Sequence, residues 1–167
     1  MNQDIVYRER ISSNRTEVLF LVLAVICLSL LAWRLATGSL DVLTVAFGVF
    51  FLFFLFYTVN YRTLEVWITS KQLNLSFGIF TWNVPLDNVK ECCLDELPPF
   101  MRMGGAGIHF MFINQRYRAS FNFLEYPRVL IAFKRKVGPV QDLSFSTRRP
   151  EEVLRVIKEA GAAIGST

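Results

Sequence analysis

The chain has 167 residues, 53% of them hydrophobic, and a formal net charge of +4. Soluble domains average roughly 45–50% apolar residues, and the excess here lies in residues 18–59, where the charged side chains are Arg34 and Asp41. This distribution excludes an ordinary soluble enzyme, a large multidomain protein and a disordered tail protein. Residues 60–167 have the composition of a soluble domain and are enough for one small core.

Two apolar runs, residues 18–36 and 40–59, predict a pair of transmembrane helices. Crossing the hydrocarbon layer takes about 20 mostly apolar residues, and the short connection contains Gly38, a residue type common at helix ends. An antiparallel helical hairpin is therefore expected. The alternative is a cleavable signal peptide followed by one anchor, with residues 36–38 imitating a cleavage site. The first run is longer than the usual h-region of about 7–15 residues, which favours the hairpin.

Lysine and arginine flank the two runs unevenly, and this predicts the orientation. Three arginines precede the first run: Arg8, Arg10 and Arg15. Near the connection there is only Arg34, and Arg62 follows the second run. Because positive flanks resist translocation, residues 1–17 are expected to be a cytoplasmic segment, with both termini on the cytoplasmic side of the inner membrane. Aromatic rings near the helix ends suit the headgroup layer: Trp33, Tyr57 and Tyr61.

From residue 62 onward apolar and polar residues alternate, a pattern typical of strands separated by turns. The expected strands are residues 64–69, 73–77, 81–84, 89–94, 107–113, 117–123, 128–133 and 140–145. Such short strands predict a small barrel or sandwich. After Pro150, two glutamates precede apolar residues at helical spacing, so an amphipathic helix that ends at Gly161 is expected to cover an open end.

Four short motifs follow one another in this domain. They are Ile68-Thr69 with the following turn, VPLDNV at residues 84–89, GGAGI at residues 104–108 and STRRPEE at residues 146–152. In order and spacing they resemble the bacterial pleckstrin-homology-like (bPH) domain of small membrane proteins, over nearly all of residues 62–160. The resemblance implies that residues 60–167 form a PH-like seven-stranded antiparallel β-barrel or sandwich, capped by a C-terminal α-helix. It also implies a binding or scaffolding module, since the family has no established general activity.

Candidate catalytic and metal-binding residues are few. His109 is the sole histidine, and with Cys92 and Cys93 it makes too few ligands for a zinc site. Asp95 and Glu96 form an acidic pair in a loop, where solvated carboxylates are expected. The glycine-rich residues 104–107 lack the Lys-Ser/Thr of a P-loop, so a structural role is favoured. We therefore expect no catalytic residue, cofactor or metal; an enzyme stays a distant alternative, which a polar pocket around His109 and the acidic pair would revive.

Two surfaces are candidates for binding lipid or a partner. The first combines basic hairpin residues with an apolar loop: Lys134, Arg135, Lys136, Arg116, Arg118, Leu97, Phe100 and Met101. Basic residues gain about 1 kcal/mol each beside an anionic leaflet, although solvated hairpin tips and a loop folded over the barrel explain the same residues. The second is a helix-packing face on the second apolar run: Phe47, Gly48, Phe50, Phe51 and Phe54.

These observations favour a membrane-anchored PH-like binding or scaffold module. It is expected to be an accessory or interaction subunit of a membrane protein assembly, with membrane lipids around it and a membrane protein or a second copy of itself as partner. Direct binding of anionic lipid is the alternative function. Nucleic-acid binding is not expected, because the basic residues are not interleaved with stacking aromatic residues on one face.

Overall fold

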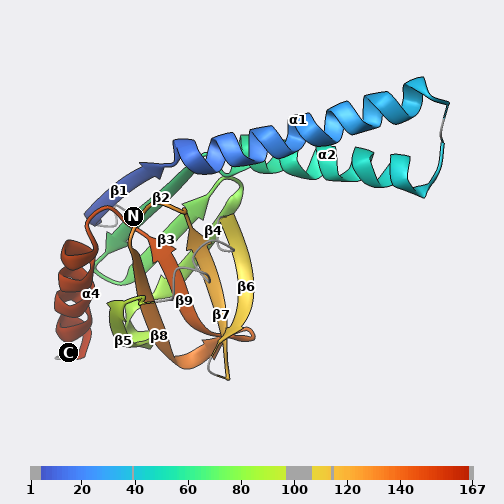
Figure 1. Ribbon diagram of the computed structural model, residues 1–167. Helices are drawn as coiled ribbons and strands as arrows, with labels where there is room; N and C mark the ends of the chain where they lie inside the picture. Colours follow the sequence, from blue (N-terminus) through green and yellow to red (C-terminus); the bar gives the residue numbers. More distant parts are fainter. Residues whose placement is uncertain (1–4, 39, 97–106, 114, 166–167) are drawn as a thin grey trace.

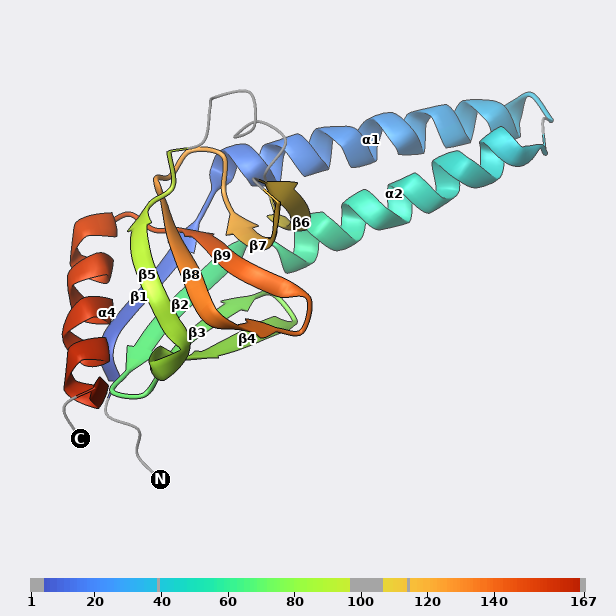
Figure 2. The same ribbon diagram turned by 90° about the horizontal axis from the view of Figure 1, so that it is seen from below.

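The computed structural model describes residues 5–38, 40–96, 107–113 and 115–165. Two long helices extend from one side of a β domain that consists of two sheets and a C-terminal helix (Figure 1). The chain therefore has an elongated helical part and a layered β part. Both described ends of the chain lie on the side of the β domain away from the helical hairpin (Figures 1 and 2).

The two helices, α1 (Asn14–Ala36) and α2 (Val42–Asn60), are long and apolar enough to cross a membrane. Their 23 and 19 residues correspond to about 35 and 29 Å of helix. Only 11% and 6% of their most apolar windows are buried, unlike a core helix of a soluble protein. Ser13 and Asp41 cap the two N-termini by accepting hydrogen bonds from backbone amides three residues later. The helix bounds thus agree closely with the two apolar runs.

The first sheet is antiparallel in the order β1-β2-β3-β4, and the second has the order β5-β8-β9-β7-β6. The strands are β1 (Ile5–Ser12), β2 (Thr63–Thr69), β3 (Gln72–Phe77), β4 (Phe80–Pro85), β5 (Val89–Leu94), β6 (Gly107–Ile113), β7 (Arg116–Asn122), β8 (Arg128–Val137) and β9 (Val140–Ser146), with a 3₁₀ turn, η1 (Leu86–Asn88), before β5. Inward-facing side chains of both sheets, among them Leu75, Phe121 and Phe145, form one buried core.

This arrangement differs from the expected seven-stranded antiparallel barrel. The described residues contain nine strands, and the two sheets do not close into a barrel. Strands β7 and β9 pair in parallel, with Arg118 opposite Asp142. Residues 123–127 connect β7 to β8, but the two strands do not pair, because β9 lies between them. Strand β9 is antiparallel to β8 and therefore parallel to β7. Eight of the strands were expected close to their observed bounds.

Strand β1 comes from the segment expected only to flank the first helix. It pairs with β2, and at its centre the side chain of Glu9 is buried. Glu9 accepts hydrogen bonds from the hydroxyls of Tyr7 (2.9 Å) and Thr147 (2.5 Å) and from the amide of Arg148 (3.0 Å). Burial and the neighbouring carboxylate raise the pKa of Tyr7 to about 12. These bonds fasten the N-terminal strand to the segment that begins the C-terminal helix.

The C-terminal helix, α4 (Pro150–Gly165), packs against β1, β5, β8 and η1. It buries Val153, Val156 and Ile157 and lies on the side of the domain opposite the hairpin (Figure 2). The helix was expected to end at Gly161, but it continues to Gly165, because a glycine inside a helix costs only about 1 kcal/mol relative to alanine and does not by itself end it. With α4 on one side, the edge strands β4 and β6 lie on the other.

Candidate functional site

A chain of aromatic rings joins the hairpin to the first sheet. Ring centroids are 4.9 Å apart between Phe20 and Tyr57, 4.3 Å between Tyr57 and Tyr61, and 4.9 Å between Tyr61 and Phe77. Tyr61, expected in the headgroup belt, is instead buried in this joint, where burial and Tyr57 raise its pKa to about 12. The aromatic joint therefore holds the β domain at a defined place beside the ends of the two helices.

The expected helix-packing face of α2 packs largely within the hairpin. A Cβ built on Gly48 would lie 4.0 Å from Leu31 of α1, and the ring of Phe54 stacks with that of Phe20. Phe47 and Phe51 are half-buried, whereas Phe50 is 52% exposed. The glycine and most of these phenylalanines therefore contribute to the contact between α1 and α2, and Phe50 is the member most available to surrounding molecules.

An open seam separates the edge strands β4 and β6. We define it by four aromatic side chains: Phe80 and Trp82 on β4, and Phe110 and Phe112 on β6. They lie on the inward face of their sheets, since Trp82 is opposite Leu75 and Phe110 is opposite Ala119, both buried. The rings of Trp82 and Phe110 are 6.4 Å apart. Nevertheless Phe80, Phe110 and Phe112 are 46%, 50% and 70% exposed.

The open seam faces the side from which the helices extend. Strand β6 begins at Gly107, where an added Cβ would lie 3.1 Å from the Tyr57 ring of α2. Strand β4 begins at Phe80, whose ring stacks with that of Tyr61. Both views show β6 on the hairpin side of the domain, with α4 opposite (Figures 1 and 2). The first residues of β4 and β6 thus lie next to the helix ends, and the exposed Phe110 and Phe112 follow further along β6.

The predicted basic residues are only partly brought together. Lys134, Arg135 and Lys136 are exposed at the end of β8, and Arg116 begins β7 at the same end of the sheet, where Asp142 binds it bidentately. Hydrogen bonding to Asp142 raises the pKa of Arg116. Arg118 was expected at the surface, but it is 6% exposed and pairs with a buried aspartate. The surface prediction for Arg118 is therefore wrong.

That aspartate is Asp95, which was expected to be solvated. Its carboxylate accepts hydrogen bonds from Arg118 Nη1 (2.9 Å) and from the Ser144 hydroxyl (2.7 Å), while its amide donates to the Arg128 carbonyl. This pair ties the end of β5 to β7 and β9. Both carboxylate oxygens of Asp95 are therefore hydrogen-bonded within the fold. The neighbouring Glu96 is exposed.

The other residues considered for chemistry are dispersed. His109 is half-buried on β6, and desolvation lowers the pKa of its imidazole. Cys92 is buried, as expected of a structural thiol, but Cys93 is exposed. Within the described residues no group of three or more His, Cys, Asp or Glu side chains is placed to hold a metal. Leu97, Phe100, Met101 and the glycines at 104 and 105 lie outside the described residues.

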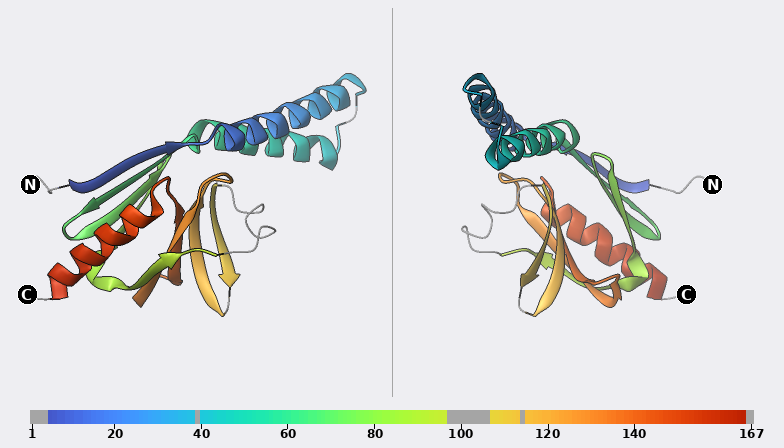
Figure 3. Two further views of the ribbon diagram at one scale, coloured as in Figure 1. Left: turned by 60° about the vertical axis from the view of Figure 1, so that its left-hand side comes forward. Right: turned by 90° about the vertical axis from the view of Figure 1, so that its right-hand side faces the viewer.

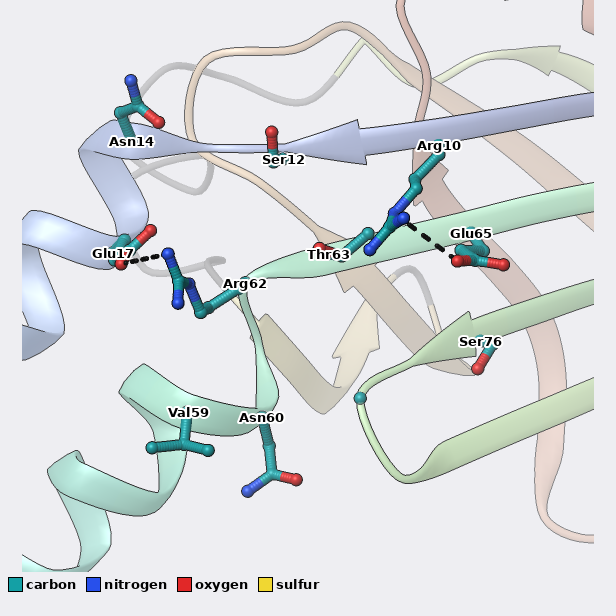
Figure 4. Close-up of a pocket in the computed structure, with 11 residues that line it drawn as sticks. Arg10, Ser12, Asn14, Glu17, Val59, Asn60, Arg62, Thr63, Glu65 and Ser76 are labelled. Atoms are coloured by element: carbon teal, nitrogen blue, oxygen red, sulfur yellow. Dashed lines mark ion pairs between the residues drawn. The ribbon is translucent and has the colours of Figure 1, made fainter.

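A polar cavity of about 510 Å³ lies where the hairpin meets the first sheet (Figure 4). We call it the juxtamembrane pocket, and its lining residues come from five elements and their connections: Arg10, Ser12, Asn14, Glu17, Val59, Asn60, Arg62, Thr63, Glu65, Ser76 and Gly78. No local motif predicts this pocket, because its residues are distant from one another in the sequence. The only available signal was the cluster of charges flanking the two apolar runs.

Two ion pairs cross the juxtamembrane pocket. Arg62 Nη2 lies 3.1 Å from Glu17 Oε1, and Arg10 Nε lies 3.5 Å from Glu65 Oε1 (Figure 4). The arginine side chains are 62% and 72% exposed, and both glutamates are 30% exposed. Exposed pairs of this kind contribute little to stability. Glu65 has a second partner, since Arg8 Nη2 lies 3.4 Å from its Oε2, so Arg10, Arg62 and Glu17 are the charges most available to a ligand.

Together these features define a protein with an exposed apolar helix hairpin, a two-sheet β domain and two surfaces beside the helix ends. No protein-family model, curated protein or solved structure matches the chain. The function must therefore be argued from the surfaces themselves.

Proposed function

We propose that α1 and α2 span the inner membrane and that the β domain is a cytoplasmic, PH-like binding module for a membrane protein partner. The almost wholly exposed apolar surface of the helices supports the membrane location. Positive charges support the orientation: Arg15 and Arg62 lie at one end of the hairpin, whereas Arg34, at the other, is neutralised by its ion pair with Asp41. The PH-like assignment has the support of the paired sheets, the C-terminal helix and the motif order.

The open seam is the observation that carries the partner-binding proposal. Within the described residues β4 pairs only with β3 and β6 only with β7, so one backbone edge of each is unpaired. Unpaired strand edges readily accept a strand from another chain. The occupant we assign is an extended segment of a membrane protein, lying where that protein leaves the bilayer. Its backbone would form hydrogen bonds with the unpaired edges of β4 and β6, and its apolar side chains would cover Phe110 and Phe112.

A strand explains the open seam better than lipid alone does. Backbone N–H and C=O groups close to the hydrocarbon layer are costly when unpaired, and acyl chains offer them no hydrogen bonds. One observation favours anionic lipid as a second candidate ligand: exposed Phe112 and the basic residues Lys134–Lys136 lie toward the same end of the second sheet. Such a combination is typical of surfaces that touch an anionic membrane.

Site-specific photocrosslinking tests the two ligands. We expect a photoreactive phenylalanine analogue at Phe110 or Phe112 to crosslink, in native membranes, to one segment of one membrane protein. The same analogue at Arg155, exposed on α4, is the control and is expected to give no adduct. Adducts to phospholipid alone at the β6 positions would contradict partner binding and support the lipid alternative.

A substitution tests the same surface energetically. We expect the pair Phe110→Ser and Phe112→Ser to reduce co-purification of the crosslinked protein tenfold or more, since buried aromatic residues at interfaces are worth about 2 kcal/mol each. Thermal stability should change little, because both side chains are at least half exposed. Leu94→Ser, at the other edge of the same sheet and 45% exposed, is the matched control. Equal losses in the control and the seam variant would count against the open seam.

A further inference from the structure

We infer that the juxtamembrane pocket binds the headgroup of a phospholipid that carries both a phosphate and a primary ammonium group, as phosphatidylethanolamine does. The inference assumes the proposed membrane-spanning helices, but it concerns another surface and another ligand than the open seam. Its basis is the depth of the pocket, its charges and its apolar border.

The pocket lies at the depth of lipid headgroups. Its lining includes Asn14, the first residue of α1, and both Val59 and Asn60, the last residues of α2. These are the points where two membrane-spanning helices would leave the hydrocarbon layer. Figure 4 shows the ends of α1 and α2 on the same side of the pocket, while β1, β2 and β3 supply the rest of its lining. Figure 3 shows the same junction, where the hairpin leaves the β domain.

The charges suit a zwitterionic headgroup. Arg10 and Arg62 supply guanidinium groups, which recognise phosphate oxygens through paired hydrogen bonds. Glu17 and Glu65 supply carboxylates that can accept hydrogen bonds from an ammonium group. The formal charges of these four lining side chains sum to zero, and Arg8, which does not line the pocket, also pairs with Glu65 at 3.4 Å; a ligand with one negative and one positive group can therefore bind the arginines without leaving Glu17 unpaired. Because the existing pairs are exposed, exchanging them for lipid contacts costs little.

The border of the pocket suits the rest of the lipid. Val59 is the one aliphatic side chain in the lining and is 65% exposed on the last turn of α2. It lies where the glycerol backbone and the first acyl carbons of a bound lipid would pass. The volume of about 510 Å³ falls within the range of small-molecule sites, roughly 300–1,000 Å³.

Two other common headgroups fit less well. A purely anionic headgroup that took Arg10 and Arg62 as phosphate ligands would leave Glu17 without a positive partner, whereas Glu65 would keep Arg8, whose Nη2 lies 3.4 Å from Glu65 Oε2. A choline headgroup has no N–H donors, and proteins recognise it with aromatic cages, whereas the residues that line this pocket include no aromatic side chain. The primary ammonium of an ethanolamine headgroup, unlike choline, can donate hydrogen bonds to a glutamate carboxylate.

Native mass spectrometry of the full-length protein, released from nanodiscs with equal amounts of phosphatidylethanolamine, phosphatidylglycerol and phosphatidylcholine, tests this inference. We expect the wild type to retain phosphatidylethanolamine preferentially. Glu17→Gln and Arg62→Gln should each reduce that retention about fivefold, as expected for the loss of one charge contact of about 1 kcal/mol. The control is Glu159→Gln in the exposed Arg155–Glu159 pair of α4, which should leave retention unchanged.

Equal retention of the three lipids, a preference for phosphatidylglycerol, or retention unaffected by the pocket variants would overturn the inference. Each variant is also crosslinked from position 110 in native membranes. A pocket variant that loses the lipid preference but still crosslinks from position 110 would show that the substitution affects lipid binding and not partner binding. Absence of a protein crosslink from position 110 in the otherwise wild-type protein would count against the proposed partner binding, but not against lipid binding in the pocket.

Discussion

Asp95→Asn is expected to lower the free energy of unfolding of the β domain by about 3–5 kcal/mol, the range for breaking a buried ion pair. The side chains of Asp95 and Arg118 are 3% and 7% exposed, so the substitution leaves a guanidinium buried without its counter-charge. The Ser144 hydroxyl also loses a charged acceptor at 2.7 Å. Denaturant unfolding of the detergent-solubilised protein, followed by tryptophan fluorescence, measures the change.

The exposed Arg155–Glu159 pair provides the control for Asp95→Asn. Its side chains are 68% and 69% exposed, so Glu159→Gln should cost no more than about 0.5 kcal/mol. A double variant, Asp95→Asn with Arg118→Met, should recover part of the loss, because no unpaired charge then stays buried. A cost for Asp95→Asn as small as that of Glu159→Gln would show that Asp95 is not the buried partner of Arg118.

Gly78→Ala is expected to disrupt the junction between the hairpin and the first sheet. Gly78 has φ +63°, and a Cβ there would lie 2.1 Å from the carbonyl oxygen of Asn60. The left-handed conformation alone costs about 1–2 kcal/mol for alanine, and the clash with backbone must add to it because backbone cannot rotate aside. We expect a total of about 3 kcal/mol or more in the same unfolding experiment.

Gly138→Ala separates the two contributions. Gly138 has φ +61° but nothing within 4 Å of its added Cβ, so only the conformational cost of about 1–2 kcal/mol applies. The difference between the two variants therefore measures the close approach of the β3–β4 turn to the end of α2. If the two substitutions cost the same, the junction is not as close-packed as the structure indicates.

Local patterns were sufficient to predict the helices and most strands. The two apolar runs are each long enough for a membrane-spanning helix, and the alternation of apolar and polar residues over residues 63–77 indicates strands with one buried face. Strand β1 was not predicted because its alternation is interrupted by Glu9, a carboxylate whose burial is compensated, beyond its neighbour Tyr7, by hydrogen bonds from Thr147 and Arg148. Those partners are 138 and 139 residues away in the sequence, so no local rule could supply them.

The candidate sites were less predictable for the same reason. The aromatic residues of the open seam have the spacing of ordinary inward-facing strand residues; only the failure of β4 and β6 to pair makes them exposed. Arg118 has the local sequence of a surface residue, and its burial depends on Asp95 from another strand. The juxtamembrane pocket is assembled from segments near residues 10–17, 59–65 and 76–78. Charge counts in the flanks of the helices located this region but could not reveal a cavity.

Thiol labelling from each side of the membrane tests the central claim, that the hairpin spans the bilayer and the β domain lies on the side of the chain ends. Cys93 is an exposed natural reporter on β5, and Leu40→Cys places a second reporter between the helices, where Leu40 is 84% exposed. A Cys27→Ala background removes the thiol of α1. Desolvation raises the pKa of Cys93, so mildly alkaline buffer is needed to form its thiolate.

In inverted inner-membrane vesicles, a membrane-impermeant maleimide should label Cys93 at once, and Leu40→Cys only after detergent is added. Intact spheroplasts should give the reverse pattern. Labelling of both positions from the same side would contradict a membrane-spanning hairpin and, with it, the account of both surfaces.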